Sequence, residues 1–443
     1  MKPTKLVTAL LFATLSPTAF AQTVVVHAGR MVDVDKGEVL ADRAITIENG
    51  RVVRVEPWSE ASARNARVID WSRYTVLPGL MDMHTHVADE GQSADPGAPL
   101  KSTPARDAFI GAKNAWDTVR AGFTTVRDVG VFRGFADVAL RDAINAGQVP
   151  GPRMFVAGAY ITIPGGGGEI TGLPEGTVVP DEFRRGVAKD EQEVRQKVNA
   201  LFDGGVDFIK VIATGAVLAA GTEPGESEYT EAQIRAAVEE AGKRHSFVAA
   251  HAHGAEGIKR ASRAGVRSIE HGSLMDDEAI ATMKQHGTWL VADIYNGDYI
   301  DTVGRAEGWS DEILRKNTDT TETQRAGFRK AVAAGVNIAY GTDSGVYPHG
   351  DNARQFAYMV RYGMTPMQAI QSATIQPARM LGREGELGSI APGKFADLIA
   401  VDGDPIADIE VLRDVRSVIK NGKRVCDGPE ECGPPRQDTS DGK

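Results

Sequence analysis

The chain has 443 residues, of which 25% are charged and 42% hydrophobic, with 49 glycines, 6% aromatics and two cysteines. This composition is that of a soluble globular enzyme, and it excludes collagen-like, disulfide-framework and wholly disordered proteins. The net charge is −10 and no basic block is present, so binding to nucleic acid or to an anionic membrane is not expected.

The N-terminus carries a targeting pattern. Lys2 and Lys5 precede an apolar run from Leu6 to Leu15, and the segment closes with Ala19-Phe20-Ala21. This order predicts a signal peptide over residues 1–21, cleaved after Ala21, and therefore an exported protein, periplasmic or secreted. The run is too short to span a membrane. An N-terminal core helix is the alternative interpretation.

Residues 78–380 repeat one unit: an amphipathic helical stretch ends at a glycine, and a short apolar run follows. The first run is VLPGLMDMHTHV. The later runs are TTVRDVG, PRMFVAG, DFIKVIA, SFVAAHAHG, RSIEHG, TWLVADI and NIAYGTD, preceded by Gly122, Gly147, Gly205, Gly242, Gly265, Gly287 and Gly335. Each glycine suits a helix C′ position with positive φ, and each run suits a strand that is covered on both faces.

The helices between these runs have their own signals. One is predicted over residues 230–241, where Thr230 is the N-cap and Gln233 completes a capping box. Another is predicted over residues 189–202, with apolar residues at helical spacing. Eight βα units predict an α/β fold of the TIM-barrel type, (β/α)8. No G-x-G-x-x-G opens the first unit, which argues against an open doubly wound sheet.

The two flanks have a β texture. Residues 22–77 and 381–426 alternate β-branched residues with turn signals, of which Asn49-Gly50 and Asn421-Gly422 predict hairpins. Together they predict one small composite β-sandwich that brings both chain ends beside the barrel. Residues 427–443 are rich in Pro and Gly and predict a flexible tail. Cys426 and Cys432 either pair as a small C-terminal loop or stay as free thiols.

Metal-ligating side chains fall at the ends of the predicted strands. His84 and His86 end the first strand and, two residues apart, lie on one face of it. The later strands contribute Lys210, His251, His253, His271 and Asp343. The C-terminal ends of barrel strands meet at one mouth, where active sites lie. The pattern therefore predicts one metal centre there.

The remaining candidates are ambiguous one by one. Lys210 in FIKVIA is either a buried lysine paired with a carboxylate or a neutral amine that has taken up CO2 as a carbamate. His27, His245 and His286 are interpreted as structural. His349 follows the last strand and lines the pocket or lies at the surface.

In PGLMDMHTH, FIKVIATG, VAAHAHG, SIEHG, GTDSG and SIAPGKFADLIAVDGDP, the chain resembles the metal-dependent amidohydrolase superfamily. It is most similar to the branch of imidazolonepropionase-like enzymes, Xaa-Pro dipeptidases and ochratoxin-hydrolysing amidases, over roughly residues 23–425. The resemblance implies two divalent metal ions, zinc, and a homo-oligomer.

The resemblance also implies roles. His84, His86 and Asp343 would hold one metal, and His251 and His271 the other, with the carbamate of Lys210 as the bridge. Asp343 would transfer the proton, Tyr229 would stabilise the oxyanion, and His253 would face the substrate. For Tyr229 a simple packing role is an equal alternative.

Three functions follow from these observations. The first is a binuclear amidohydrolase that cleaves an amide bond to a C-terminal amino or imino acid, in N-acyl amino acids, dipeptides or ochratoxin-type amides that release phenylalanine. A cyclic amide or lactone hydrolase is the alternative within the superfamily, and a non-catalytic periplasmic solute-binding protein is the alternative outside it. The sequence departs from the family pattern at one position that concerns binding of the small-molecule substrate. Gly167 stands where many relatives carry a His that contacts the substrate.

Overall fold

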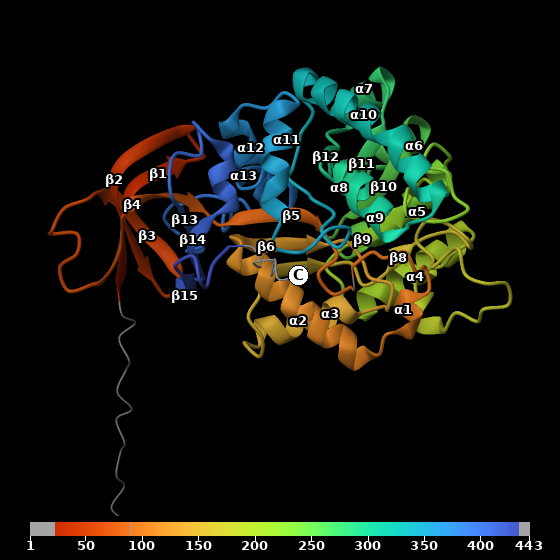
Figure 1. Cartoon of the computed structure of the whole chain (residues 1–443), viewed down its shortest axis with the longest axis horizontal. Coiled ribbons are helices and arrows are strands. Elements are labelled where there is room, and N and C mark those ends of the chain that lie inside the picture. Colours follow the sequence, from red (N-terminus) through yellow and green to blue (C-terminus); the bar gives the residue numbers. More distant parts are fainter. Residues whose placement is uncertain (1–22, 90, 434–443) are drawn as a thin grey trace, which may run out of the picture.

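The computed structural model describes residues 23–89 and 91–433. The signal peptide predicted over residues 1–21 lies outside these residues. Figure 1 shows a β-rich part at one end of the molecule and a larger part in which helices surround parallel strands.

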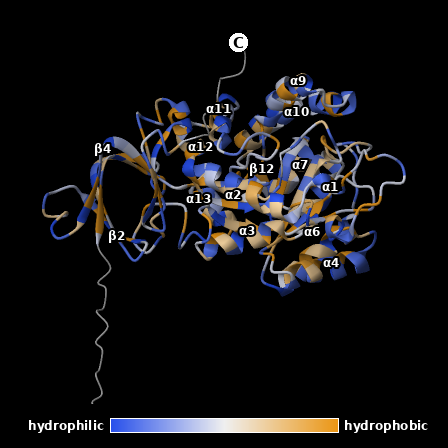
Figure 2. Cartoon of the chain, turned by 60° about the horizontal axis from the view of Figure 1, so that its bottom comes forward, coloured by the Kyte–Doolittle hydropathy of each residue, from blue (hydrophilic) through white to orange (hydrophobic). Residues whose placement is uncertain are grey.

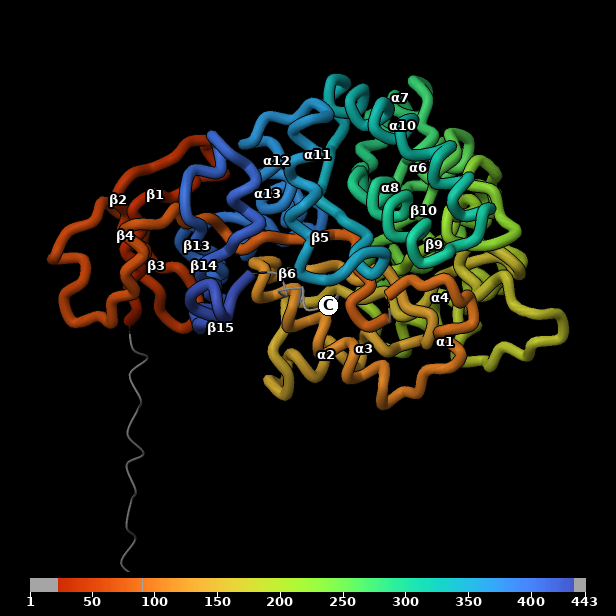
Figure 3. Tube along the Cα trace, viewed as in Figure 1, coloured from red at the N-terminus to blue at the C-terminus, as the bar shows by residue number. Residues whose placement is uncertain are grey.

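The β-rich part is built from both ends of the chain. Its seven strands form one sheet in the order β15-β14-β13-β4-β1-β2-β3. They are β1 (Val24–Asp33), β2 (Glu38–Glu48), β3 (Arg51–Pro57), β4 (Arg67–Pro78), β13 (Leu398–Val401), β14 (Val415–Lys420) and β15 (Lys423–Asp427). β4 lies beside β13, with Leu398 opposite Pro78, and Figure 3 shows the N-terminal and C-terminal segments side by side. The predicted meeting of the two flanks is present as this shared sheet.

Both predicted hairpin turns are confirmed. Asn49 and Gly50 connect β2 to β3 with φ of 51° and 77°, and Asn421 and Gly422 connect β14 to β15 with φ of 50° and 71°. Two consecutive residues with positive φ are what a type I′ turn requires.

The larger part contains two parallel sheets. One has three strands, β5 (Leu80–Thr85), β6 (Phe123–Asp128) and β7 (Arg153–Val156). The other has five strands, β8 (Tyr160–Ile161), β9 (Ile209–Ile212), β10 (Val248–Gly254), β11 (Ser268–Leu274) and β12 (Trp289–Val291). Every residue of β5, β6 and β9 is buried, as expected of strands covered on both faces.

The predicted eighth strand takes an irregular extended form. Residues 337–344 form isolated bridges to both neighbours, Leu290 with Ile338 and Thr85 with Ser344. On one side Ala339 N donates to Leu290 O at 3.0 Å, and on the other Met83 N donates to Tyr340 O at 2.8 Å. The segment therefore lies between β12 and β5.

The helices lie around the parallel strands, and in Figure 2 they carry both hydrophilic and hydrophobic residues. Their apolar faces pack on the strands in the largest core of the described chain. The longer helices are α2 (Pro104–Arg120), α3 (Ala136–Asn145), α4 (Glu191–Asp203), α5 (Glu231–Lys243), α6 (Ala255–Ala264), α7 (Asp277–His286) and α10 (Asp311–Ala334). The shorter ones are α1 (Ala98–Lys101), α8 (Asn296–Tyr299), α9 (Arg305–Glu307), α11 (Gln355–Arg361), α12 (Pro366–Ser372) and α13 (Ile375–Met380), with a π-helical turn at Ile300–Gly304 and 3₁₀ turns at Asp181–Phe183, Asn352–Arg354 and Ile409–Arg413.

The capping predictions are confirmed with one exception. The capping box of Thr230 and Gln233 begins α5, and six of the seven glycines that precede the apolar runs have positive φ. Gly242 is the exception, because α5 continues to Lys243 and the left-handed position moves to His245, with φ of 56°.

The C-terminal segment is held in place as far as residue 433. Cys426 and Cys432 form a disulfide, Cys432 N donates to Gly428 O at 2.9 Å, and Gly433 N donates to Arg120 O at 2.9 Å. The flexible tail predicted over residues 427–443 is therefore wrong for this part, and residues 434–443 lie outside the described chain. Among the described helices, none has the length and apolar character needed to cross a membrane.

Candidate metal centre

The chain contains a cavity of about 350 Å³ into which the ends of several parallel strands project. All six predicted metal ligands line this cavity, and so does His253, which is predicted to face the substrate. The six ligands are His84, His86, Lys210, His251, His271 and Asp343. The structure thus brings together side chains that are up to about 260 residues apart in the sequence, as the placement at strand ends predicts.

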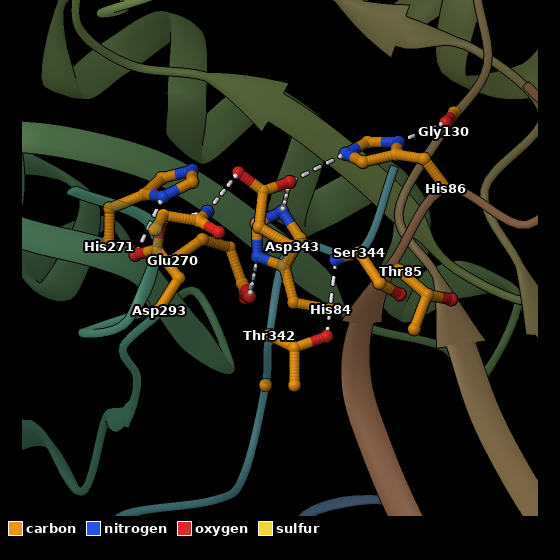
Figure 4. Close-up of polar contacts among 12 residues, drawn as sticks. His84, Thr85, His86, Gly130, Glu270, His271, Asp293, Thr342, Asp343 and Ser344 are labelled. Carbon is orange, nitrogen blue, oxygen red and sulfur yellow. Dashed lines mark hydrogen bonds and ion pairs between the residues drawn. The ribbon is translucent and has the colours of Figure 1, made fainter. Parts of the chain in front are cut away.

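A first group of ligands is formed by His84, His86 and Asp343 (Figure 4). Oδ1 of Asp343 lies 3.2 Å from Nε2 of His84 and 3.1 Å from Nε2 of His86. Burial would raise the pKa of Asp343, but the charges and hydrogen bonds of the two histidines outweigh it and hold that pKa well below its usual range. Asp343 is therefore an ionised carboxylate between two imidazoles.

The orientation of these two histidines is fixed by contacts to their Nδ1 atoms. Nδ1 of His84 lies 3.0 Å from Oε2 of Glu270, and Nδ1 of His86 lies 2.8 Å from the carbonyl oxygen of Gly130. Both contacts engage the Nδ1 atom and direct Nε2 toward Asp343, which is the arrangement that metal-binding histidines commonly have.

Glu270 in turn belongs to a fully buried ion pair. Its Oε1 accepts hydrogen bonds from Nη2 of Arg127 at 2.7 Å and from Oγ of Ser268 at 2.5 Å. Burial acts to raise the pKa of Glu270, but the opposing effects of Arg127, His84 and Lys210 are larger and lower this pKa below its usual value, so the carboxyl stays ionised. Neither Glu270 nor Arg127 was identified from the sequence, although Glu270 stands in the SIEHG motif.

Two glycines of the GTDSG motif allow this close packing. A Cβ at Gly341 would lie 2.1 Å from Val291 and 2.9 Å from His84, and one at Gly345 would lie 2.9 Å from His86. Asp343 between them has a positive φ of 57°, in the left-handed region that few non-glycine residues other than Asn and Asp adopt.

A second group contains His251, His253 and His271, whose ligating nitrogens lie within 4.8 Å of one another. The ring centroids are separated by 4.5 to 4.7 Å. Burial lowers the pKa of His253 to about 3 and that of His251 well below its usual value. The rings of His251 and His253 are therefore neutral, as metal ligation requires.

His253 belongs to this group as closely as His251 does. Nδ1 of His253 lies 2.7 Å from Oγ of Ser273, and Nε2 of His251 lies 3.3 Å from the carbonyl oxygen of Gly215. Each ring thus keeps one nitrogen for a ligand.

Asp293 joins the two groups and was not identified from the sequence. It forms a third set of ligands with His271 and Asp343, and it accepts a hydrogen bond from Nε2 of Gln324 at 2.8 Å. Its only sequence signal is its place at the end of the TWLVADI run. Nδ1 of His271 lies 3.1 Å from Oδ1 of Asp293, yet this buried nitrogen has no hydrogen-bond partner among the described residues.

Lys210 is buried in β9 at the same cavity. Burial lowers its pKa to about 8, although Glu270, Asp343 and Asp293 act in the opposite direction. A substantial share of the amine is neutral near pH 8, which is the form that reacts with CO2.

These residues fit a divalent metal site. Imidazole and carboxylate are suitable ligands for zinc and related ions. The buried Nδ1 of His271 makes no hydrogen bond among the described residues, although it lies 3.1 Å from Oδ1 of Asp293, and a buried polar atom without a hydrogen bond is costly unless a ligand satisfies it. The donor set of the two groups is large enough for more than one ion.

Tyr229 is not brought to this cavity, contrary to its predicted role. Its side chain is buried in the main core, and its hydroxyl donates to the carbonyl oxygen of Ala188 at 2.7 Å. It is absent from the described lining of the cavity, and this position favours the packing alternative. The tyrosine that does line the cavity is Tyr160, whose hydroxyl lies 3.1 Å from Nδ1 of His86.

The other histidines lie away from the ligands, with one exception. His245 and His286 are exposed, and His27 stacks on Trp58 in the β-rich part, as predicted. His349 is buried and does not face the cavity, because its ring lies behind the first group, with Nε2 at 3.3 Å from the carbonyl oxygen of His86.

Gly167, the position without the expected histidine, does line the cavity. A Cβ there would approach Ala216 to 3.1 Å, and the Gly167 amide donates to Oε1 of Glu228 at 2.8 Å. The glycine loop is therefore packed and hydrogen-bonded.

Comparison with known proteins gives a consistent result. The sequence profile of the amidohydrolase family matches residues 75–425. The ochratoxinase of Aspergillus niger is 30% identical over 94% of this chain and 89% of its own length. The imidazolonepropionase of Chromobacterium violaceum is 25% identical over 82% of this chain and 86% of its own. A solved structure of a Xaa-Pro dipeptidase with bound methionine in the active site has a TM-score of 0.85 and 40% identity, covering 91% of this chain and 99% of that chain.

Proposed function

The chain belongs to the amidohydrolase family and is a hydrolase that acts on amide or peptide bonds, and from this premise we propose that it is an exported, binuclear metal-dependent enzyme that cleaves an amide bond to a C-terminal amino or imino acid. The observation that carries the proposal is the convergence of two ligand groups and Lys210 in one cavity. The substrate class is supported by the relatives, which include an ochratoxinase and a Xaa-Pro dipeptidase.

In this proposal His84, His86 and Asp343 hold one zinc ion, and His251 and His271 hold the other. Lys210, once carboxylated by CO2, would supply further ligand oxygens, and His253 would face the substrate. The short distances from Asp343 to both histidines support the first set, and the low pKa of His251 supports a neutral ligand in the second.

When bound, a pair of divalent ions supplies a polarised carbonyl and a hydroxide near neutral pH. The protein's own residues do the rest. Asp343 is ionised and lies at the meeting point of the ligands, so it is placed to take the proton of the nucleophile and to give it to the leaving nitrogen. Glu270 and Gly130 keep His84 and His86 in the tautomer that turns Nε2 toward the site.

The barrel and the domain division are part of the same proposal. We propose that residues 78–380 form a closed (β/α)8 barrel and that residues 22–77 and 381–426 form a β-sandwich beside it. The hydrogen bonds of segment 337–344 to β5 and β12 support closure on one side. On the other side, Asp207 N, just before β9, donates to Val156 O of β7 at 2.9 Å.

Export and assembly complete the proposal. The disulfide between Cys426 and Cys432 supports an oxidising compartment, which agrees with a signal peptide over residues 1–21. The homo-oligomer implied by the family resemblance remains a proposal, to be measured by light scattering of the mature chain.

Metal analysis combined with turnover tests the proposal. We expect two metal ions per chain and release of phenylalanine from ochratoxin-type amides or of proline from Xaa-Pro dipeptides. The Lys210→Ala variant should lose metal and turnover, whereas the matched control Lys330→Ala, which changes an exposed lysine of α10, should keep both. Full activity of a chelated, metal-free preparation would refute the mechanism. Turnover of cyclic amides or lactones alone would identify the enzyme as a cyclic amide or lactone hydrolase. Metal binding without any turnover would favour a solute-binding protein.

A further inference from the structure

The cavity has an apolar wall formed by the long loop after β9, the segment that leads into the first turn of α10, and Val346. Its members are Val217, Leu218, Ile300, Trp309, Ile313 and Val346. Ile300, Trp309 and Val346 are buried in one small cluster, against which Leu218 and Ile313 pack. Nε1 of Trp309 donates to Glu307 at 3.2 Å, so the polar atom of the indole is satisfied and the packed ring adds apolar surface to the wall.

This wall is held in position by α10. The ammonium group of Lys316 is fully buried and donates to the carbonyl oxygens of Ala219 and Thr222, both at 2.7 Å. Lys316 also pairs with Glu312, which accepts a hydrogen bond from the Gly221 amide at 2.8 Å. The loop is thus fixed before any substrate binds, which favours a preformed apolar pocket.

Cationic side chains are scarce in the cavity. Among the described residues that line it, Lys210 is the only lysine and no arginine occurs. Asp95, Glu169 and Glu312 also line the cavity, and each is paired with a cation that is not part of the described lining, namely Lys101, Arg184 and Lys316. A substrate carboxylate would therefore meet no free positive side chain there.

The glycine loop does not offer an anion site either. All four amides of residues 165–168 are used inside the protein. Gly165 N donates to Glu169 at 2.6 Å, Gly166 N to Ile163 O at 3.0 Å, Gly167 N to Glu228 at 2.8 Å and Gly168 N to Thr162 Oγ1 at 3.2 Å. A backbone nest for a carboxylate needs free amides, and none is left in this loop.

We propose that this enzyme recognises its substrates by a bulky apolar group and that the free carboxylate of the leaving group contributes little to recognition. The proposal rests on the proposed function, because it concerns which amides enter the same site. It extends the substrate class from N-acyl amino acids to neutral amides that carry a large aromatic or aliphatic group.

Four amides that differ in two features test this proposal on the metal-loaded enzyme. The bulky pair is N-(2-naphthoyl)-phenylalanine and N-(2-naphthoyl)-phenethylamine, and the small pair is N-acetyl-alanine and N-acetyl-ethylamine. Within each pair only the carboxylate is removed. We expect kcat/KM to be at least tenfold higher for the bulky pair and to change less than threefold when the carboxylate is removed.

A variant of the wall provides an independent measurement. Ile313→Ser should lower kcat/KM at least fivefold for the bulky pair and leave the small pair unchanged. The matched control Val178→Ser changes a side chain that is 86% exposed and outside the cavity lining, and it should change neither pair.

The outcomes distinguish a failure of the proposed substrate recognition from a failure of the proposed function. A loss of threefold or more on removal of the carboxylate would overturn the proposed recognition, as would a preference of less than tenfold for the bulky amides. In both cases the amide hydrolase function would stand. Hydrolysis of none of the four compounds would refute the proposed function and this inference with it.

Discussion

Replacing Glu270 by glutamine removes one charge from the buried ion pair behind the first ligand group. Arg127 would keep its charge with a side-chain exposure of 0%, and the amide of the new glutamine would place a donor opposite another donor. Breaking a buried pair from one side costs about 3–5 kcal/mol. We therefore expect the Glu270→Gln variant to lose about 3 kcal/mol of unfolding free energy.

The same substitution should weaken metal binding. His84 receives its orientation from Oε2 of Glu270, and loss of such a partner typically lowers metal affinity roughly 10- to 100-fold. The assay is urea denaturation followed by circular dichroism, together with metal affinity measured by competition with a chelator.

A double-mutant cycle isolates the charge effect. Arg127→Met alone leaves the Glu270 carboxylate without its arginine partner, whereas the double variant Arg127→Met/Glu270→Gln leaves no buried charge in this pair. We expect the double variant to be more stable than the sum of the single changes by about 2 kcal/mol. The control is Asp319→Asn, which breaks the exposed pair with Arg315 and should cost less than about 0.5 kcal/mol. If Glu270→Gln unfolds like the parent protein and keeps its metal affinity, the argument from buried charge is refuted.

Three further changes have defined outcomes. Lys316→Met leaves the buried carbonyl oxygens of Ala219 and Thr222 without a donor, so we expect the unfolding free energy to fall by about 2–4 kcal/mol. We also expect the KM for bulky amides to rise at least threefold while kcat stays within twofold. An unchanged KM in steady-state kinetics would contradict the positioning role. Burial raises the pKa of Glu228 to about 7. The native carboxyl therefore holds a proton that the unfolded chain has already released above pH 4.5, and stability falls as the pH rises from about 4.5 through 7. Glu228→Gln should remove this fall and gain up to about 2 kcal/mol above pH 7, measured as urea midpoints across pH, and parallel pH profiles of the two proteins would count against it. Cys432→Ser opens the C-terminal loop and should cost at most about 2 kcal/mol while exposing β15 to proteolysis; equal digestion rates would argue against this.

The sequence was sufficient for the features that depend on local pattern. The capping box at Thr230, the hairpin at Asn49-Gly50 and the ligands at strand ends all follow from spacing and alternation within a few residues. The strand ends were informative because parallel strands place them at one edge, so that a local pattern becomes a shared site.

Features that depend on contacts between distant segments were not predictable in this way. The pair of Glu270 with Arg127 joins β11 to β6, and a buried arginine in a strand gives no sign of which carboxylate it meets. Tyr229 was placed by resemblance in the cavity, yet its hydroxyl bonds to Ala188 from a core position that only the packing of the loop after β9 determines. Gly242 followed the glycine rhythm, but two more residues of helix moved the turn to His245.

The histidines of β10 show where alternation stops being informative. His251 and His253 are two residues apart, so alternation places both on one face of the strand, and both indeed lie with His271. What distinguishes them is the partner of the second ring nitrogen. Gly215, in the loop after β9, engages Nε2 of His251, whereas Ser273 of β11 engages Nδ1 of His253. Nδ1 of His251 and Nε2 of His253 are therefore the nitrogens left for a metal or a substrate. Spacing selects the residues, and the neighbouring loop and strand select the atoms.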